Sequence, residues 1–280
     1  MTEPVKITTL SENSAIGQCI GEWGLSILIE ADGCKVLFDT GRSFTAVLNA
    51  QTLGIDLADV DKLVLSHGHY DHTGGLKDII IRSGGMEVIS HPNAWAPKYK
   101  CLPDKEPQYI GIPYPQAELE ALGATFTFSK QPVAISENIM TTGEIPQVTD
   151  FETINTMLCV QDGDSYLKDD FWDDQALIVK TDDVLVVILG CAHRGVINTL
   201  LHARKITGID RINAIVGGLH LMSASDGHIS RVIDELRKFD TKMIAASHCT
   251  GFTACCHLHQ SFGDKFALNN AGTAFTLPAL

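Results

Sequence analysis

The sequence predicts an α/β protein, and three observations carry that prediction. Short apolar runs alternate with stretches of helical periodicity, and four of the apolar runs lead into histidine residues. Hydrophobic residues make up 45% and charged residues 20% of the 280 residues, which is typical of a globular chain with a sizeable core. Open α/β sheets place their ligand sites beyond the carboxyl ends of strands. The four histidine-bearing strand ends are therefore expected to converge on one site.

The N-terminal third begins with a predicted strand pair. The runs LSILIEADG (25–33) and CKVLFDTG (34–41) are apolar and β-branched, and Asp32-Gly33 between them is a hairpin turn signal. The stretch SFTAVLNAQTLG (43–54) is expected to form a helix that stops at Gly54. The run DKLVLSHGHYDH (61–72) then indicates a buried strand that leads directly into a histidine cluster.

The C-terminal half repeats this pattern of apolar strands that lead into histidines. The runs DDVLVVILGCAHRG (182–195), INAIVGGLHL (212–221) and KMIAASHCTG (242–251) are predicted strands that end near His193, His220 and His248. Helices are expected between them at VINTLLHARKITG (196–208) and ISRVIDELRKF (229–239), the second with one apolar face.

The segment between His91 and Gln147 differs in composition from the rest of the chain, because it holds eight of the ten prolines. We expect a single domain over residues 1–280, with an irregular insertion or lid at approximately 92–147. Trp95 and Tyr99 in this segment suit a lid that stacks on a planar ring, although such aromatics more often pack on their own domain.

Composition excludes several functions. The 21 basic and 34 acidic residues give a net charge of −13, which argues against a nucleic-acid partner. The longest apolar run, VLVVILGCA, is too short to span a bilayer, and the N-terminal stretch lacks a signal-peptide pattern, so no membrane association and a cytoplasmic location are expected. The eight cysteines are scattered without a C-x-x-C pair, so no disulfide framework is expected.

The cluster His67, His69, Asp71 and His72 places four ligand side chains within six residues. His67 and His69 are two residues apart, so in extended chain they point the same way and can chelate one ion. Asp71 and His72 lie past the bend, where they can reach a second ion. Each ion still needs another protein ligand, which the distant histidines can supply.

This H-x-H-x-D-H motif after a buried strand, with LFDTG upstream, resembles the metallo-β-lactamase superfamily over nearly the whole chain. The resemblance implies a four-layer αββα sandwich with two divalent metal ions at the strand ends. Zinc is the expected metal, while manganese and iron also suit histidine and aspartate ligands. The resemblance also implies the following assignments: His67 and His69 bind the first metal, Asp71, His72 and His248 bind the second, and Asp39 lies buried behind the site.

The sequence departs from the family pattern at the middle ligands. Where the family has a strand ending in Gly-Asp, this chain has Gly190-Cys191, with His193 following. We assign His193 as the third ligand of the first metal. Cys191 then takes the bridging position, or Asp174 of WDDQAL supplies the missing carboxylate. A buried thiol and a capping aspartate are the structural alternatives.

The stretches TTGEIP, DDQAL, GCAHRGVIN, GGLHL and HCTG resemble a narrower subgroup, the 7,8-dihydropterin-6-methyl-4-(β-D-ribofuranosyl)aminobenzene 5′-phosphate synthase-like metal-dependent hydrolases. The expected activity is hydrolysis of a phosphoester or acyl bond of a small molecule by a metal-bound hydroxide, since a metal lowers the pKa of bound water to roughly 7. The first alternative is a transferase that joins a dihydropterin pyrophosphate to a ribofuranosylaminobenzene phosphate. The second is a non-catalytic metal-containing binding protein.

Two residues are the predicted catalytic groups, Asp71 through its carboxylate at the metals and His220 as a proton donor to the leaving group. His220 also has a structural alternative. Thr250 of HCTG, with nearby backbone N–H groups, is a candidate contact for an anionic substrate, phosphorylated or pterin-like. The glycine that follows it is equally consistent with a simple turn.

Overall fold

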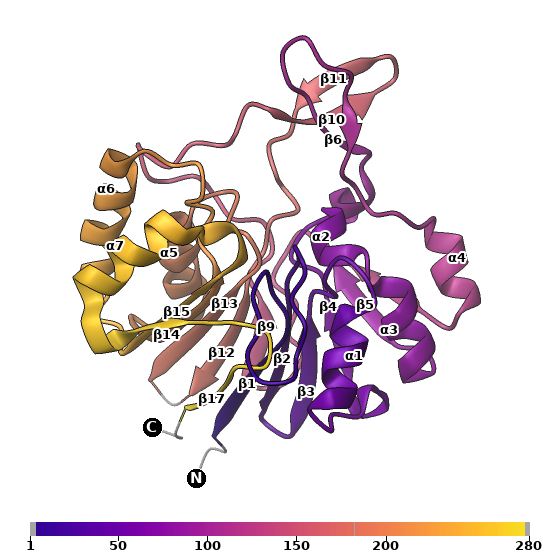
Figure 1. Cartoon of the computed structure of the whole chain (residues 1–280), viewed down its shortest axis with the longest axis horizontal. Coiled ribbons are helices and arrows are strands. Elements are labelled where there is room, and N and C mark those ends of the chain that lie inside the picture. Colours follow the sequence, from indigo (N-terminus) through magenta and orange to yellow (C-terminus); the bar gives the residue numbers. More distant parts are fainter. Residues whose placement is uncertain (1–3, 182, 278–280) are drawn as a thin grey trace.

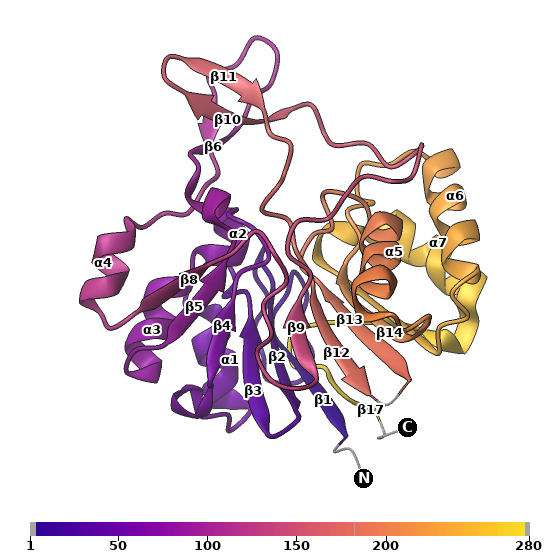
Figure 2. The same ribbon diagram turned by 180° about the vertical axis from the view of Figure 1, so that it is seen from behind.

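The computed structural model describes residues 4–181 and 183–277. Within these residues, two mixed β-sheets pack face to face and helices cover the outer face of each, giving four layers in the order α, β, β, α (Figures 1 and 2). The α/β class and the αββα sandwich expected from the sequence are confirmed.

The first sheet carries the N-terminal strands and the second sheet carries most of the C-terminal ones. In spatial order, the first sheet runs β17 (Ala274–Leu277), β1 (Val5–Ser11), β2 (Ser26–Ala31), β3 (Cys34–Phe38), β4 (Lys62–Val64), β5 (Glu87–Ser90) and β8 (Thr125–Phe128). The second sheet runs β16 (Phe266–Leu268), β15 (Met243–Ser247), β14 (Arg211–Gly218), β13 (Val184–Leu189), β12 (Leu177–Thr181) and β9 (Ile139–Thr141).

The core between the sheets is built from alternate residues of these strands. Ile27 and Ile29 of β2 face Val186 and Ile188 of β13 in one buried cluster, whereas Leu28 points to the helices outside the first sheet. Both faces of such strands are covered, which is why they read as continuous apolar runs rather than alternating ones. Each of these fully buried side chains contributes about 1.5–3 kcal/mol relative to exposure.

The predicted hairpin lies between β2 and β3, which pair antiparallel with Ala31 opposite Cys34. Asp32 and Gly33 at its tip have φ of 54° and 66°. Positive φ at both central residues is the geometry that a two-residue turn needs to match the strand twist, and it explains why Asp-Gly occurs here.

Helices form over all three stretches that the sequence predicts as helical, 43–54, 196–208 and 229–239. α1 (Thr45–Thr52), α3 (Leu76–Ser83) and α4 (Gln116–Ala121) flank the first sheet, and α5 (Val196–Thr207), α6 (Asp226–Arg237) and α7 (Phe252–Phe262) flank the second (Figure 1). Short elements complete the chain: α2 (Tyr70–Thr73) and the 3-10 turns at Leu57–Asp59, Pro92–Trp95, His248–Thr250 and Gly263–Lys265. α5 ends at Gly208 with φ of 71°, a left-handed terminus that glycine adopts without strain.

A smaller sheet projects from the sandwich above α2 (Figures 1 and 2). It runs β11 (Ser165–Lys168), β10 (Leu158–Asp162), β6 (Lys98–Lys100) and β7 (Gln108–Tyr109). The segment 92–147, expected to be an irregular insertion, is therefore only partly irregular. Its β8 and β9 are strands of the main sheets, while the projecting sheet also recruits 158–168. Proline content marked the irregular connections but not the strand pairing that crosses them.

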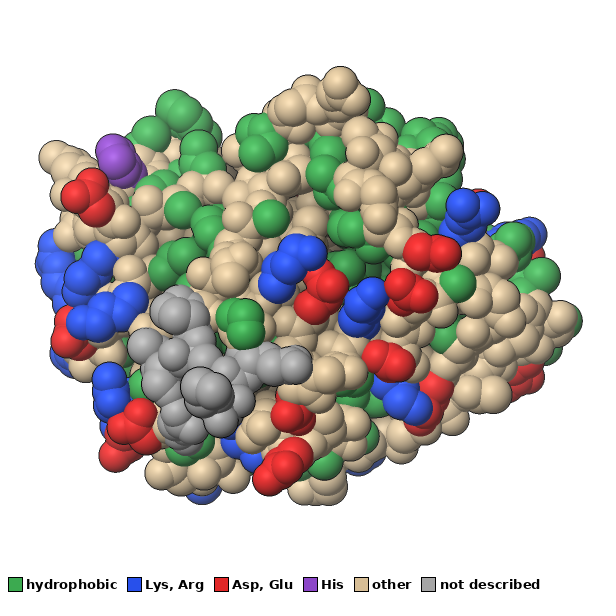
Figure 3. Space-filling model, turned by 90° about the horizontal axis from the view of Figure 1, so that it is seen from below, with side chains coloured by type: hydrophobic (Ala, Val, Ile, Leu, Met, Phe, Trp, Pro, Cys, Tyr) green, Lys and Arg blue, Asp and Glu red, His purple; other side chains and the backbone are tan. Residues whose placement is uncertain are grey.

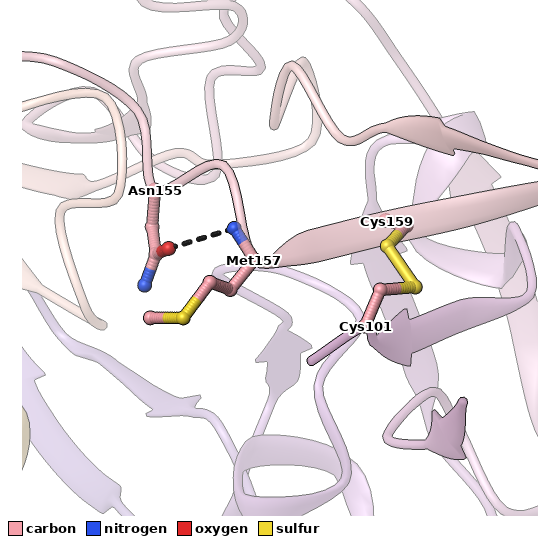
Figure 4. Close-up of a disulfide and its surroundings, with 4 residues drawn as sticks. All are labelled: Cys101, Asn155, Met157 and Cys159. Carbon is pink, nitrogen blue, oxygen red and sulfur yellow. Dashed lines mark hydrogen bonds between the residues drawn. A yellow bond between two sulfur atoms is a disulfide. The ribbon is translucent and has the colours of Figure 1, made fainter. Parts of the chain in front are cut away.

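The projecting sheet contains a disulfide between Cys101 and Cys159 (Figure 4). The sequence predicts no disulfide framework, and the other six cysteines are free, but this pair is bonded. The two residues are 58 positions apart, yet the antiparallel pairing of β6 with β10 brings their Cα atoms to 6.3 Å. Spacing along the chain gives no sign of this, because only the sheet pairing makes them neighbours.

The face opposite the projecting sheet has interspersed lysine, arginine, aspartate and glutamate side chains (Figure 3). None of the helices in the described part of the chain is long and apolar enough to cross a membrane.

Candidate metal centre

The loops that follow β4, β13, β14 and β15 meet at one edge of the sandwich, near α2 (Figure 1). The strands β13, β14 and β15 are parallel neighbours, so their carboxyl ends share this edge. β4 leads into His67, β13 into His193, β14 into His220 and β15 into His248. The predicted convergence of histidine-bearing strand ends is confirmed.

His67, His69 and His193 form the first cluster. His67 Nε2 lies 3.0 Å from His69 Nδ1 and 3.3 Å from His193 Nε2. The three side chains are buried, with exposed fractions of 0%, 6% and 6%. One ring nitrogen from each of the three lies within 4.8 Å of the other two, which is close enough for a single ion to contact all three.

Asp71, His72 and His248 form the second cluster. His248 Nε2 lies 3.2 Å from His72 Nε2 and 3.4 Å from Asp71 Oδ2. Trp23 borders this cluster, because its indole N–H donates to Asp71 Oδ2 at 2.8 Å and its ring centroid is 4.9 Å from that of His248. One carboxylate with two imidazoles is a donor set that suits zinc, manganese or iron.

Cys191 lies between the two clusters. Its Sγ is 3.2 Å from His72 Nε2, and it also groups with His67 and His72 within 4.8 Å. Cys191, His193 and His220 form a further group of the same tightness. The thiol therefore faces residues of both clusters, as a ligand shared by two ions would.

Hydrogen bonds behind the rings fix which nitrogen faces the centre. Asp39 Oδ2 accepts from His72 Nδ1 at 2.6 Å and from Ser66 Oγ at 2.6 Å, while Ser66 Oγ accepts in turn from His67 Nδ1 at 2.9 Å. A carboxylate only accepts, so each of these imidazoles carries its proton on Nδ1. The Nε2 atoms of His67 and His72 consequently face the clusters, and each offers a lone pair there when its ring is neutral.

His248 is held in the same way from the other side. Its Nδ1 donates to Asn13 Oδ1 at 3.0 Å, its carbonyl accepts from Asn13 Nδ2 at 3.1 Å, and its backbone N–H donates to Glu12 Oε1 at 2.7 Å. These contacts hold His248 at φ of 53°, a left-handed conformation that is unfavourable for a residue other than glycine. Such strain at a ring directed into a cluster is typical of functional sites.

The histidines of the first cluster and His72 of the second cluster have pKa values shifted in opposite directions. Burial lowers the pKa of His67 and His193 well below the ordinary value and that of His69 to about 3. Burial also opposes the charged form of His72, but the Asp39 carboxylate more than offsets it and raises the pKa of His72 to about 9. The first cluster is therefore uncharged at neutral pH and needs no proton removed before it binds a cation.

These side chains fit two divalent metal ions. In the first cluster, neutral imidazoles whose inward nitrogens lie 3.0–3.3 Å apart oppose their lone pairs, and a cation between them would convert that repulsion into coordination. The first ion would be held by His67, His69 and His193, and the second by Asp71, His72 and His248, with Cys191 between them.

Two other residues from the sequence analysis lie in or near this centre. His220 joins the group with Cys191 and His193, with its ring centroid 4.2 Å from that of His193. Its Nδ1 is buried and has no hydrogen-bond partner. Asp174 lies outside both clusters, because its Oδ2 accepts from the backbone N–H of Arg194 at 2.9 Å.

The three residues considered for substrate contact all pack against other parts of the chain. Trp95 packs edge-to-face against Phe126 and Phe128 on the outer side of the first sheet, with ring centroids 5.1 and 5.6 Å away. Tyr99 packs against other tyrosines of the projecting sheet. Thr250 is buried and its Oγ1 accepts from Leu219 N at 3.0 Å, so its hydroxyl supports the β14 loop.

Sequence reasoning missed several residues around the centre. The ring of Phe171 stacks on His193, with centroids 4.0 Å apart and planes 13° apart. Phe171 lies in the run DDFWDD (169–174), whose density of acidic and aromatic residues was an available signal. Trp23 precedes a glycine and a strand, but nothing in the spacing of Trp23 or Asn13 marks them as partners of the clusters.

Comparisons with known proteins agree with this geometry. A model of the metallo-beta-lactamase superfamily matches residues 24–194. The 7,8-dihydropterin-6-methyl-4-(beta-D-ribofuranosyl)-aminobenzene-5'-phosphate synthase of Methanocaldococcus jannaschii is 32% identical over 280 residues, covering 96% of this chain and 95% of that protein. An uncharacterized protein of the same organism is 33% identical, covering 91% of this chain and 94% of that protein.

A solved structure is also similar over its full length. Tm1679, described as a metal-dependent hydrolase of the beta-lactamase superfamily, has a TM-score of 0.85 and 30% identity, covering 98% of this chain and 99% of that chain. The family model spans well over half of the described residues, and the similarity to the synthase extends over nearly all of them. The chain belongs to the metallo-β-lactamase superfamily.

Proposed function

We propose that this protein is a hydrolase that uses two divalent metal ions, zinc in the first instance, to cleave a phosphoester or acyl bond of a small molecule. One observation carries the proposal: two buried three-residue clusters lie side by side, and Cys191 faces both of them. A donor set of this kind supplies two adjacent ions, as hydrolytic two-metal sites require.

The chain's own residues have distinct roles in this reaction. When bound, the metal ions lower the pKa of a water molecule and stabilise negative charge that develops on the scissile group. Asp71 contributes a carboxylate whose position is fixed by the Trp23 indole N–H. His220 reaches the centre beside His193, where it is placed to give a proton to the leaving group. Both residues remain proposals for catalytic groups.

A transferase is the second candidate, and the activity for which the Methanocaldococcus jannaschii relative is named favours it. That relative is named as a synthase of a dihydropterin-aminobenzene phosphate, so a dihydropterin pyrophosphate and an aryl acceptor are the corresponding substrates to test here. The same ligands would serve this reaction, with diphosphate as the leaving group. The two candidates differ in whether the acceptor is needed.

The deciding experiment starts from purified protein whose metal content is measured by plasma emission. Turnover of phosphodiester and thioester substrates is measured before chelation, after chelation and after zinc or manganese is restored. A hydrolase loses turnover on chelation and regains it with metal, and turnover that survives complete metal removal would overturn the proposal. Pyrophosphate release from the dihydropterin pyrophosphate only when the aryl acceptor is present would support the transferase. Two bound metals without turnover in either assay would favour a binding protein.

A further inference from the structure

The segment 169–174 connects the projecting sheet to β12 and supports both loops that carry the first cluster. Asp173 Oδ2 accepts from Gly68 N at 2.9 Å, and Gly68 lies between His67 and His69. Phe171 stacks on His193 and meets the ring of His69 edge-on, with centroids 5.4 Å apart. Below, 169–174 is called the support segment.

One buried cation holds the support segment. Lys98 Nζ donates to Asp169 Oδ2 at 2.6 Å and to Asp173 Oδ1 at 2.9 Å. The same ammonium lies 5.0 Å from the centroid of the Phe171 ring. The side chain is 1% exposed although lysine is almost never fully buried, and it comes from β6, the strand of the projecting sheet that follows Ala96 and Pro97.

The charges make Lys98 hard to replace in this position. Asp169 and Asp173 are also buried, so the two carboxylates share one counter-charge. Without the ammonium they would repel each other in a region of low dielectric. Each oxygen of Asp173 has its own donor, Lys98 on one and Gly68 on the other, so a shift of this carboxylate displaces the peptide between the two histidines.

The loop that contains Gly68 is tightly packed against its neighbours. A Cβ atom on Gly68 would lie 1.9 Å from the carbonyl oxygen of Ala94, so the backbone there is in close contact with the neighbouring turn. The second cluster depends on other contacts, since Asp39 orients His72 and Asn13 orients His248. Asp39 also reaches His67 through Ser66, but the contacts of the support segment described above go to the first cluster.

We propose that Lys98 is a positioning residue for the first cluster: it fixes the support segment, which through the Gly68 peptide and the Phe171 ring sets His67, His69 and His193 for metal binding. The inference rests on the proposed metal centre. It assigns the projecting sheet a role in the metal centre, because β6, the first strand of that sheet along the chain, tunes the affinity of one metal and not of the other.

The test is a stepwise zinc titration of the metal-free full chain against a chelating dye. His69→Ala and His248→Ala identify which step belongs to which cluster. In Lys98→Met, the Kd of the step that His69→Ala abolishes is expected to rise about 10- to 100-fold, as for residues that orient metal ligands. The step that His248→Ala abolishes is expected to stay within about 2-fold of wild type. Lys100→Met is the matched control, since Lys100 lies on the same strand but is exposed, and both of its steps should match wild type.

Asp173→Asn provides a second route if Lys98→Met does not fold. The amide keeps the side-chain volume but offers one acceptor oxygen in place of two, so it can serve Gly68 or Lys98 but not both. The same selective weakening is expected. Equal weakening of both steps, or no weakening in a folded Asp173→Asn protein, would overturn the inference. Wild-type protein lacking two binding steps would contradict the proposed function and this inference together, whereas two wild-type steps with unchanged variants would contradict this inference alone.

Discussion

Asp39 and His72 form a completely buried pair in which the carboxylate Oδ2 lies 2.6 Å from the imidazole Nδ1. The aspartate also accepts two hydrogen bonds from Ser66, one from its backbone N–H at 2.7 Å and one from its hydroxyl at 2.6 Å. Ser66 is in turn hydrogen-bonded to His67. One carboxylate therefore orients a histidine of the second cluster directly and a histidine of the first cluster through a hydroxyl.

Asp39→Asn is expected to lower the affinity for the second metal about 10- to 100-fold, because the amide removes the charge that fixes the His72 ring and its tautomer. The first metal should be affected less, since Ser66 lies between Asp39 and His67. A zinc titration against a chelating dye measures both steps. Asp59→Asn, in an exposed ion pair with Lys35, is the matched control. Wild-type affinity at the second metal in Asp39→Asn would contradict this role for the carboxylate.

His69→Ala is expected to reduce the metal content from two ions to about one, because the first cluster then keeps only two ligands. Hydrolytic turnover should fall by more than the roughly 10- to 100-fold that loss of a ligand-orienting residue causes. Plasma emission gives the metal content and the substrate panel gives the turnover. His257→Ala, a partly exposed histidine on α7, should change neither. Two tightly bound ions in His69→Ala would exclude His69 as a ligand.

The sequence was sufficient for the features that local geometry determines. The spacing of His67 and His69 in extended chain and the shared edge of parallel strands follow from strand periodicity, so the grouping of His67, His69 and His193 could be anticipated. The hairpin at Asp32-Gly33 followed from its turn chemistry in the same way. These predictions depend on contacts within a segment, or on the direction in which neighbouring strands run.

The remaining features depend on contacts between distant segments. Lys98 meets residues about 70 positions away, and its burial is not visible in a strand that reads KYK. Trp95 looked like a lid residue because proline surrounds it, yet phenylalanines of β8 cover it. The Cys101–Cys159 pair depends on a strand pairing across 58 residues. A single sequence carries no signal for such pairings.

Cobalt substitution tests whether Cys191 is a ligand. Its thiol faces both clusters, so the cobalt-loaded protein is expected to show a near-ultraviolet thiolate-to-metal charge-transfer band that Cys191→Ser abolishes. Cys249→Ser is the matched control, because that buried thiol donates instead to the carbonyl oxygen of Cys191. A band that survives in Cys191→Ser and disappears in Cys249→Ser would transfer the ligand role to Cys249.

The pH dependence of stability tests whether Asp174 is a structural carboxylate or a metal ligand. Burial raises the pKa of Asp174 to about 7, above its ordinary value in the unfolded chain, so the folded state favours the protonated form. Stability is then lost as pH rises from about 4 to about 7, by about 4 kcal/mol in total. Asp174→Asn still accepts from Arg194 N but cannot ionise, so urea unfolding should find it close to wild type at pH 4 and more stable by several kcal/mol at pH 8. Its metal content should stay at two ions, and the loss of one would show that Asp174 supplies the missing carboxylate.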